Sequence, residues 1–427
     1  MKLNSNNRRS FLKSAGIGSF AAMGTGMIPS ATLSAINNAE PMKITKIEAV
    51  RFRPDLRVED RVINWTWVLI HTNTGIVGIG ETYPYADGEI GMLKTLSSRI
   101  IGKDPRDIEK LWWETYLYAA FRVSGGAEMR MISAINIALW DILGKALGVP
   151  VYRLLGGKVQ QGIRIYNTTP NRLQVNNMNA DDNIEGICRF LLSKGIKALK
   201  LVVYDNAGIR NNGAYITPVE AKQHLELIKR IRDSVGYEME VGFEFHSRWN
   251  LPSAIRIAKS LEPYNPMFIE DILMPDNAQS YAVLARETSI PLMVSERNST
   301  RYDYRELLEA KAVDLVMWDV TWCGGITSAK KISDLADTYY IPVVAHTNGG
   351  PILWVSSIQT LTSIRNVHVS ESVYQSYNSV YQYFITNVPV PDKNGLVTPP
   401  EAPGLGVELR EEPFKKGEAI IETIAEI

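Results

Sequence analysis

Residues 240–296 read EVGFEFHSRWNLPSAIRIAKSLEPYNPMFIEDILMPDNAQSYAVLARETSIPLMVSE. This stretch holds three short apolar runs with the character of strands, at 240–245, 267–270 and 291–295. Between the first two, residues 252–261 have the apolar spacing of an amphipathic helix, and residues 218–235, before the first run, predict another. Strands that alternate with helices in this way predict parallel β-α units.

Five further strands extend this pattern on both sides, at 163–167, 198–203, 314–317, 342–345 and 367–370. Eight parallel strands over roughly 210 residues predict an α/β fold, a (β/α)8 TIM-type barrel, whose usual size is about 250 residues. A doubly wound open sheet would need fewer strands and a Gly-rich first turn. No Gly-x-Gly-x-x-Gly or phosphate-loop motif follows any strand, so nucleotide chemistry is disfavoured.

The region before the barrel has a different pattern. Period-two segments come first and helical patterns second, at 44–53, 65–72 and 76–81, then at 90–101, 105–118 and 131–147. An antiparallel meander followed by helices is typical of an α+β domain. We therefore expect an N-terminal α+β domain at residues 42–160, in front of the barrel at residues 161–390.

The first 40 residues have the features of an export signal. A twin arginine, Arg8-Arg9, precedes a modest apolar stretch at 15–27 and small residues at 31–35. That order is typical of a twin-arginine signal, which exports folded proteins; a disordered tail with a chance Arg-Arg is the alternative. The apolar stretch is too short and Gly-rich to span a bilayer. We expect residues 1–40 to be this signal and the protein to be periplasmic.

The composition of the chain indicates which class of molecule the protein binds. The 427 residues include 46 basic and 46 acidic ones, and the formal net charge is zero, so binding to nucleic acid is not expected. Two cysteines, Cys188 and Cys323, can build neither a disulfide framework nor a Cys-ligated zinc site. A small molecule is the expected partner. We also expect a homo-oligomer without a membrane span.

One ionisable side chain stands at the end of each strand from the third to the eighth. They follow one another at intervals of 26, 26, 23, 27 and 25 residues: Glu244, Glu270, Glu296, Asp319, His346 and Glu371. A single acidic residue after a strand is often only the N-cap of the next helix. Six in register favour a site, because the catalytic residues of this fold come from the C-terminal ends of the strands.

Three of these side chains have the chemistry of a magnesium site. Glu244, Glu270 and Glu296 offer hard oxygen ligands, with no Cys or His among them, and this suits Mg²⁺ better than Zn²⁺. A bound Mg²⁺ would stabilise the second negative charge that forms when a proton is removed next to a carboxylate. The sequence thus predicts a lyase or isomerase that forms an enolate.

The other polar residues supply candidates for the acid and the base. His346 and Asp319 end neighbouring strands, so the carboxylate can fix the imidazole tautomer and raise its basicity. His246 lies two residues after Glu244, on the same strand face, and is a candidate general acid. Lys200 on the second strand is a further candidate, with a snorkelling structural lysine as the alternative.

Several longer motifs occur in the order found in a known family. They are GIGE at 78–81, AINIALWDILGK at 134–145, EFHSR at 244–248, FIE at 268–270, ER at 296–297, GGIT at 324–327 and PGLGVE at 403–408. On these motifs, the chain after the signal resembles the mandelate racemase branch of the enolase superfamily. Among its members, the galactonate-dehydratase-like ones are the most similar.

The resemblance implies roles for the strand-end residues. It implies that Glu244, Glu270 and Glu296 bind Mg²⁺, that His346 and Asp319 form the base dyad, that His246 is the acid assisting departure of the β-hydroxyl, and that Lys200 and Glu371 lie near the substrate carboxylate. The family reaction would remove water from an aldonate, a sugar acid, to give a 2-keto-3-deoxy acid. The capping domain, together with residues 391–427, would close the site, and the loop near 83–89 would choose the sugar.

Two departures from the family pattern bear on the reaction. Val202 stands where many relatives carry the second Lys of a Lys-x-Lys pair, which removes a base from that face and favours dehydration over racemisation. Glu244 stands where the pattern has Asp, and its reach is longer. An epimerase, racemase or anhydro-sugar-acid cycloisomerase on the same scaffold stays open. So does an exported carbohydrate-binding relative without catalysis.

Overall fold

The computed structural model describes residues 41–85, 87–119, 125–170 and 174–427. The predicted export signal at 1–40 lies outside these residues. Met42–Ile427 forms one unit. In the described part of the chain no helix combines the length and the apolar character needed to cross a membrane. Cys188 and Cys323 are both buried and form no disulfide.

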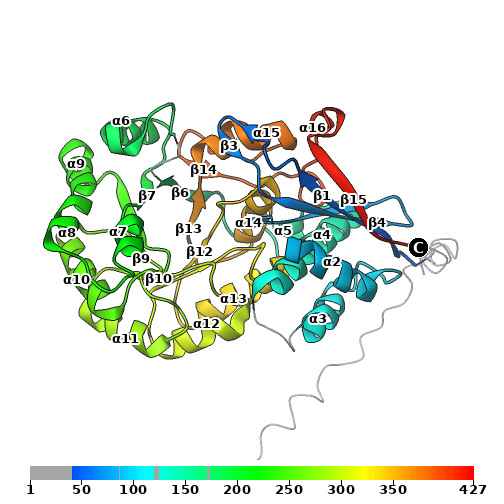
Figure 1. Cartoon of the computed structure of the whole chain (residues 1–427). Helices are drawn as coiled ribbons and strands as arrows, with labels where there is room; N and C mark the ends of the chain where they lie inside the picture. Colours follow the sequence, from blue (N-terminus) through cyan, green and yellow to red (C-terminus); the bar gives the residue numbers. More distant parts are fainter. Residues whose placement is uncertain (1–40, 86, 120–124, 171–173) are drawn as a thin grey trace, which may run out of the picture. The chain divides into compact units, whose positions relative to one another are not determined.

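The chain begins with an antiparallel sheet. The predicted meander is confirmed as β1 (Ile44–Phe52), β4 (Thr66–Thr72) and β5 (Val77–Thr82), with a small hairpin of β2 (Arg57–Val58) and β3 (Arg61–Val62) between the first two. At the other edge β15 (Ala419–Glu426) pairs antiparallel with β1. The last strand of the chain therefore completes the sheet of the N-terminal domain (Figure 1).

Three helices accompany this sheet: α2 (Asp87–Ile100), α3 (Ile108–Ala119) and α4 (Gly126–Leu147). α4 lies so close to β5 that only glycine fits at two positions of this strand, Gly78 and Gly80. A Cβ at Gly78 would lie 2.2 Å from the carbonyl oxygen of Ala138, and one at Gly80 only 1.8 Å from that of Ala134. The Gly-x-Gly of the sequence motif is thus a packing requirement.

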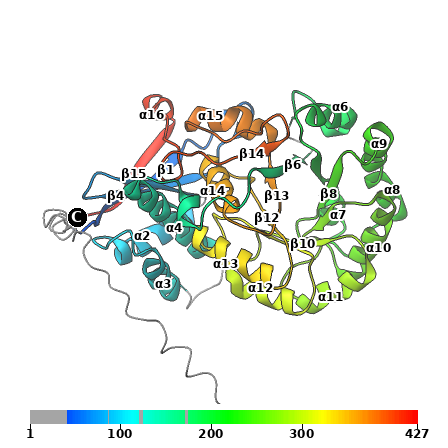
Figure 2. The same ribbon diagram turned by 180° about the vertical axis from the view of Figure 1, so that it is seen from behind.

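Eight parallel strands form the barrel, which confirms the predicted (β/α)8 fold. They are β6 (Ile163–Pro170), β7 (Ala198–Val202), β8 (Glu240–Glu244), β9 (Phe268–Glu270), β10 (Leu292–Val294), β11 (Leu315–Trp318), β12 (Val343–Ala345) and β13 (Val367–Ser372). β13 pairs in parallel with β6, so the sheet closes on itself. Figures 1 and 2 show this ring from opposite sides, with the connecting helices outside it.

The helices between the strands are α6 (Ala180–Ser193), α7 (Asp205–Arg210), α8 (Pro218–His224), α9 (Glu226–Val235), α10 (Leu251–Leu261), α11 (Ala278–Glu287), α12 (Thr300–Glu309), α13 (Gly325–Thr338) and α14 (Pro351–Thr362). Short elements complete the chain: α5 (Val151–Leu154), α15 (Tyr381–Phe384), β14 (Leu396–Val397) and α16 (Glu412–Lys415). The single helix predicted at 218–235 is wrong, because the structure has α8 and α9 with a break at Leu225. Only α9 buries apolar side chains, Ile228 and Ile231.

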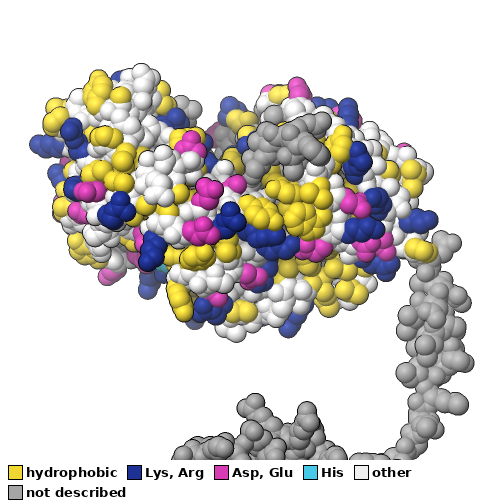
Figure 3. Space-filling view, turned by 90° about the horizontal axis from the view of Figure 1, so that it is seen from below, with side chains coloured by type: hydrophobic (Ala, Val, Ile, Leu, Met, Phe, Trp, Pro, Cys, Tyr) yellow, Lys and Arg dark blue, Asp and Glu magenta, His cyan; other side chains and the backbone are white. Residues whose placement is uncertain are grey.

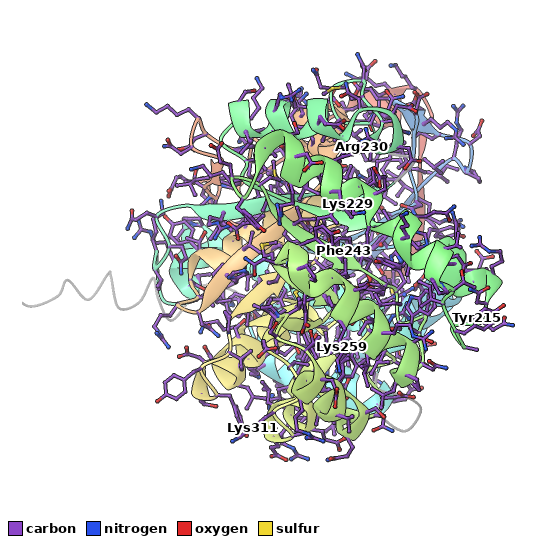
Figure 4. The ribbon with its side chains drawn as sticks, turned by 90° about the vertical axis from the view of Figure 1, so that its left-hand side faces the viewer. Tyr215, Lys229, Arg230, Phe243, Lys259 and Lys311 are labelled. Atoms are coloured by element: carbon purple, nitrogen blue, oxygen red, sulfur yellow. The ribbon has the colours of Figure 1, made fainter. Side chains whose placement is uncertain are left out.

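Side chains alternate between the inside and the outside of the barrel. An interior cluster holds one or two apolar residues from every strand except β8: Tyr166, Ala198, Phe268, Met293, Leu315, Met317, Val344 and Val369. Phe243 of β8 instead belongs to the outer core, and in Figure 4 its label lies between those of Lys229 on α9 and Lys259 on α10. Two residues beyond the interior layer, the same face carries the polar side chains of the site.

Charges are mixed on the surface. On the face drawn in Figure 3, Lys and Arg side chains are interspersed with Asp and Glu, and no broad area of one sign forms there. This matches the balanced composition of the chain.

Glu81 joins the N-terminal domain to the barrel. Its carboxylate, at the end of β5, is fully buried and accepts hydrogen bonds from the backbone N–H groups of Gly350, Ile352 and Leu353 and from the indole N–H of Trp67. The backbone donors belong to the first turn of α14, whose orphan N–H groups favour an anion. Glu81 thus fixes the segment that follows β12.

We expect Glu81→Gln to destabilise the protein by about 2–4 kcal/mol. Each carboxylate oxygen accepts from two N–H donors, so the amide NH₂ would face two of them, and buried unsatisfied donors cost about 1–3 kcal/mol each. Urea unfolding measures the change. Glu109→Gln, at an exposed residue paired with Lys331, is the matched control. A loss no larger than that of the control would show that Glu81 does not hold the two domains together.

Candidate active site

Lys200 is the centre of a buried charge cluster at the C-terminal ends of the strands. Its Nζ lies 2.7 Å from Oε2 of Glu270, 3.0 Å from Oε1 of Glu371 and 3.2 Å from Oε2 of Glu244. None of the four side chains is more than 5% exposed. Alternation along β7, β8, β9 and β13 points all four inward, so three carboxylates from separate strands share one ammonium group.

His346 and Asp319 form a second, adjoining group. Nδ1 of His346 lies 2.8 Å from Oδ2 of Asp319, and the N–H and hydroxyl of Thr321 both donate to Oδ1 of the same carboxylate. An ionised carboxylate only accepts hydrogen bonds, so Nδ1 carries a proton and Nε2 is the nitrogen that can exchange one. The predicted dyad is therefore present, with its tautomer fixed.

The free nitrogen of His346 faces the carboxylates. Nε2 lies 3.5 Å from Oε2 of Glu371 and 3.9 Å from Oε2 of Glu296. Burial alone would lower the pKa of His346, but the charges of Glu296, Glu371 and Asp319 outweigh it and raise the pKa to about 10. The imidazole is therefore protonated near neutral pH unless another positive charge joins the cluster.

The carboxylates of the cluster differ in their affinity for protons. Burial and the charge of Glu244 raise the pKa of Glu270 well above its ordinary value, against the opposing effect of Lys200. Burial would also raise the pKa of Glu371, but Lys200, His346 and a hydrogen bond from Thr168 lower it to about 2. Glu270 therefore takes up a proton far more readily than Glu371, which stays ionised.

His246 stands at the edge of this cluster, not in contact with Lys200. Its Nδ1 lies 2.7 Å from Oδ2 of Asp205, whose other oxygen lies 3.1 Å from Nε of Arg248. Burial would lower the pKa of His246, but its hydrogen bond with Asp205 and the charge of Glu244 raise it above the ordinary value. His246 and Asp205 form a second His–Asp pair, at the ends of β8 and β7.

We expect Asp205→Asn to lower the pKa of His246 below its ordinary value of about 6.5, because burial then acts against fewer opposing charges. NMR titration of the His246 ring protons measures it. Asp334→Asn, at an exposed carboxylate paired with Lys330, is the control and should leave the titration unchanged. An unaltered His246 pKa in Asp205→Asn would exclude Asp205 as the partner that sets it.

The predicted metal ligands are close together but not arranged around a common point. In the described part of the chain, no three His, Cys, Asp or Glu side chains form a group that could hold a metal ion as they stand. Glu244 and Glu270 each turn an oxygen to Lys200 instead. The donor chemistry still fits Mg²⁺: Glu244, Glu270 and Glu296 are hard oxygen ligands, and Oε1 of Glu270 is buried without a hydrogen-bond partner.

The N-terminal domain contributes to the wall of the site. Trp322, in the loop after β11, stacks on Tyr83 with ring centres 5.6 Å apart and donates its indole N–H to the Tyr83 carbonyl. Its ring centre lies 6.2 Å from that of His346. The guanidinium of Arg130 on α4 covers Trp322 at 4.1 Å and pairs with Glu89. Tyr83 is therefore linked to His346 through one indole ring.

Comparison with protein families identifies the two parts of the chain. Residues 60–156 match the "Mandelate racemase / muconate lactonizing enzyme, N-terminal domain", and residues 185–413 match "Enolase C-terminal domain-like". The second match alone covers more than half of the chain. The chain belongs to the mandelate racemase and muconate lactonizing enzyme family of the enolase superfamily. The family that the sequence motifs resemble is thereby confirmed.

Curated members of the family resemble this chain over most of its length. It is 34% identical to "D-galactonate dehydratase" of Pectobacterium atrosepticum over 379 residues, which are 87% of this chain and 93% of that protein. It is 32% identical to "D-galactonate dehydratase" of Ralstonia pickettii over 378 residues, with the same coverage. This similarity supports an enzyme of the superfamily that acts as an acid-sugar dehydratase.

Solved structures of family members have the same fold. An enolase of the mandelate racemase subgroup from Agrobacterium tumefaciens is 36% identical, covers 90% of this chain and all of its own, and superposes with a TM-score of 0.79. A putative dehydratase from Salmonella enterica serovar Typhimurium is 32% identical, covers 89% of this chain and 99% of its own, and gives a TM-score of 0.82.

For this family member, the structure brings together seven of the eight predicted site residues through direct contacts. They are Lys200, Glu244, Glu270, Glu371, His346, Asp319 and Glu296. The eighth, His246, lies at the edge of the group. Sequence reasoning missed Asp205, which follows β7 by three residues but lies 39 residues before Glu244, out of step with the other strand ends. It also missed Trp322, for which the sequence held no signal.

Proposed function

We propose that the protein is an Mg²⁺-dependent sugar-acid dehydratase, a hydro-lyase that converts an aldonate into a 2-keto-3-deoxy acid. The observation that carries the proposal is the His346–Asp319 dyad, whose Nε2 faces a cluster of buried carboxylates. Such a cluster can receive a cation, and a base beside it can remove the proton next to a bound acid group.

Each residue has a defined task in this proposal. Nε2 of His346 takes the proton from C2 of the substrate, and Asp319 stabilises the imidazolium that forms. Lys200 attracts the substrate carboxylate. His246, held by Asp205, gives a proton to the leaving hydroxyl at C3, so that the C2–H and C3–O bonds break and water departs. The enol that remains tautomerises to the 2-keto acid.

Glu244, Glu270 and Glu296 would hold the magnesium ion. When bound, it supplies a positive charge that stabilises the enolate and lowers the pKa of His346 from about 10 toward neutrality. The fit rests on their oxygen donors and on the unpartnered Oε1 of Glu270.

A keto-acid assay over a library of sugar acids, with 5–10 mM Mg²⁺ or with EDTA on the order of 1 mM, tests the proposed function. The expected result is a 2-keto-3-deoxy product from one class of aldonates, lost on chelation and restored by Mg²⁺. Formation of no keto acid from any of them, at protein concentrations that bind Mg²⁺, would overturn the proposal.

Two alternative functions have their own tests. An epimerase, racemase or cycloisomerase would incorporate solvent deuterium at C2 without loss of water. A carbohydrate-binding relative without catalysis would fail to bind Mg²⁺ by calorimetry. The ordered His346–Asp319 dyad favours catalysis, and Val202, which takes the place of a second lysine on β7, favours dehydration.

We also propose that residues 1–40 are a twin-arginine signal and that the enzyme works in the periplasm as a homo-oligomer. The order of Arg8-Arg9, the apolar stretch and the small residues supports export. Fractionation of cells that carry the wild type or Arg8→Lys/Arg9→Lys tests it, with periplasmic enzyme expected only for the wild type.

A further inference from the structure

An open cavity of about 620 Å³ lies beside the proposed catalytic cluster. Glu296 and Trp322 line its inner side, and Trp322 also contacts His346. Asn298 and Tyr302, in and after the loop that leaves β10, line another side, and Arg130 of the N-terminal domain lines a third. The cavity thus begins where the reacting end of a bound acid would lie and extends away from it.

The cavity is larger than a simple sugar acid requires. Its volume equals that of about 20 water molecules at ~30 Å³ each, and it falls in the range of pockets that hold drug-sized ligands. A six-carbon aldonate has only about 13 non-hydrogen atoms. Moreover, Lys200, Glu270 and His346, where its carboxyl end would be bound, are not part of the cavity wall. Space for a second sugar unit therefore remains.

Asn298 presents an unused amide to this space. The residue is only 5% exposed, and its side chain makes no hydrogen bond with the described part of the chain. Its backbone is fixed, because its N–H donates to Ser295 and its carbonyl accepts from the Tyr304 hydroxyl. An amide both donates and accepts, as sugar hydroxyls do, so a hydroxyl-rich ligand satisfies it.

The charges of the wall argue against a second acidic group on the ligand. Among the described residues of the wall, three are arginines, and each already lies near a carboxylate: Arg130 is 3.0 Å from Glu89, Arg297 is 3.5 Å from Asp271 and Arg305 is 3.8 Å from Glu309. Four carboxylates line the same wall: Asp276, Glu296, Asp303 and Glu306. From these described residues, a distal carboxylate or phosphate would find no surplus of positive charge.

We propose that the substrate is a glycosyl aldonate, an aldonic acid that carries a neutral sugar unit, and that Asn298 binds this second unit. The inference rests on the proposed dehydratase function for the acid end. It adds the class of the substrate and a residue that selects it. The exposed ring of Tyr302, at the rim of the cavity, offers an apolar face to the same sugar unit.

The test compares matched acids: gluconate, cellobionate and lactobionate, with glucarate and 6-phosphogluconate as the doubly acidic set. In the wild type, the binding affinity measured by calorimetry should be about tenfold or more higher for a glycosyl aldonate than for gluconate. The same ratio is expected for kcat/KM where turnover occurs. Asn298→Leu should reduce that ratio to about twofold, whereas Asn394→Ala, in an exposed loop, should leave it unchanged.

The outcomes separate the two proposals. Three results would overturn the glycosyl site while the dehydratase function stands. They are turnover of aldonates without preference for the glycosylated ones, tighter binding of the doubly acidic set, and an unchanged ratio in Asn298→Leu. Preferred binding of glycosyl aldonates that depends on Asn298, without keto-acid formation from any acid, supports the site and overturns the function. Binding of no acid overturns both.

Discussion

Replacing His346 with Asn should lower kcat by about 10³-fold or more and leave Mg²⁺ affinity within about threefold of the wild type. The amide keeps a group of similar size beside Asp319 but cannot accept a proton from carbon. His346 touches Glu296 and Glu371 only at 3.9 and 3.5 Å, so the oxygens proposed for the metal stay in place. Steady-state kinetics and calorimetry measure the two quantities.

A loss of folding would also lower activity. The His346→Asn variant is therefore compared with the wild type by thermal unfolding and circular dichroism as well. Asn394→Ala, in an exposed loop, serves as the control for handling. Turnover within about tenfold of the wild type in a folded His346→Asn variant would remove His346 as the base.

Replacing Lys200 with Met should destabilise the metal-free protein by about 3–5 kcal/mol, the usual cost of leaving buried charge without its partner. Glu244, Glu270 and Glu371 would then share a buried space without the ammonium group. Urea unfolding in EDTA measures the loss, and Mg²⁺ should restore part of it by replacing the missing positive charge. Lys259→Met, at an exposed residue paired with Glu287, should cost far less.

The same variant has a defined pH dependence. Loss of Lys200 removes a charge that now lowers the pKa of Glu270 and Glu371. A carboxyl group whose pKa is raised on folding adds stability below its unfolded value of about 4.5, and this is lost as the pH rises through the folded value. The deficit of Lys200→Met should therefore be small near pH 4 and grow toward pH 8. A constant deficit over this range would contradict the role assigned to Lys200.

The fold could be predicted from the sequence because the periodicity of the apolar residues and the spacing of the strand-like runs follow directly from it. Eight strand-like runs kept the repeat of a β-α unit, and all eight are strands of the barrel. The helix at 218–235 was predicted as one piece because its apolar spacing continues through Leu225. The structure divides it at Leu225, and only α9 carries fully buried apolar side chains.

The site was predictable in its residues but not in its contacts. Strand ends converge by topology, so the inward positions of Glu270 and His346 follow from counting residues. That Lys200 pairs with three carboxylates depends on side-chain length and rotamer, which the sequence does not report. The loops after the strands could be predicted still less: Asn298 and Trp322 gain their importance only from the cavity that forms when the chain folds.

The most direct test of the account uses an accepted sugar acid labelled with tritium at C2. The wild type should release the tritium into water at the rate of keto-acid formation, because His346 removes that hydrogen in the reaction. His346→Asn should bind the same acid and release no tritium above background. Release at the wild-type rate by His346→Asn, or formation of a keto acid that carries the tritium at C3 instead of releasing it into water, would contradict the account.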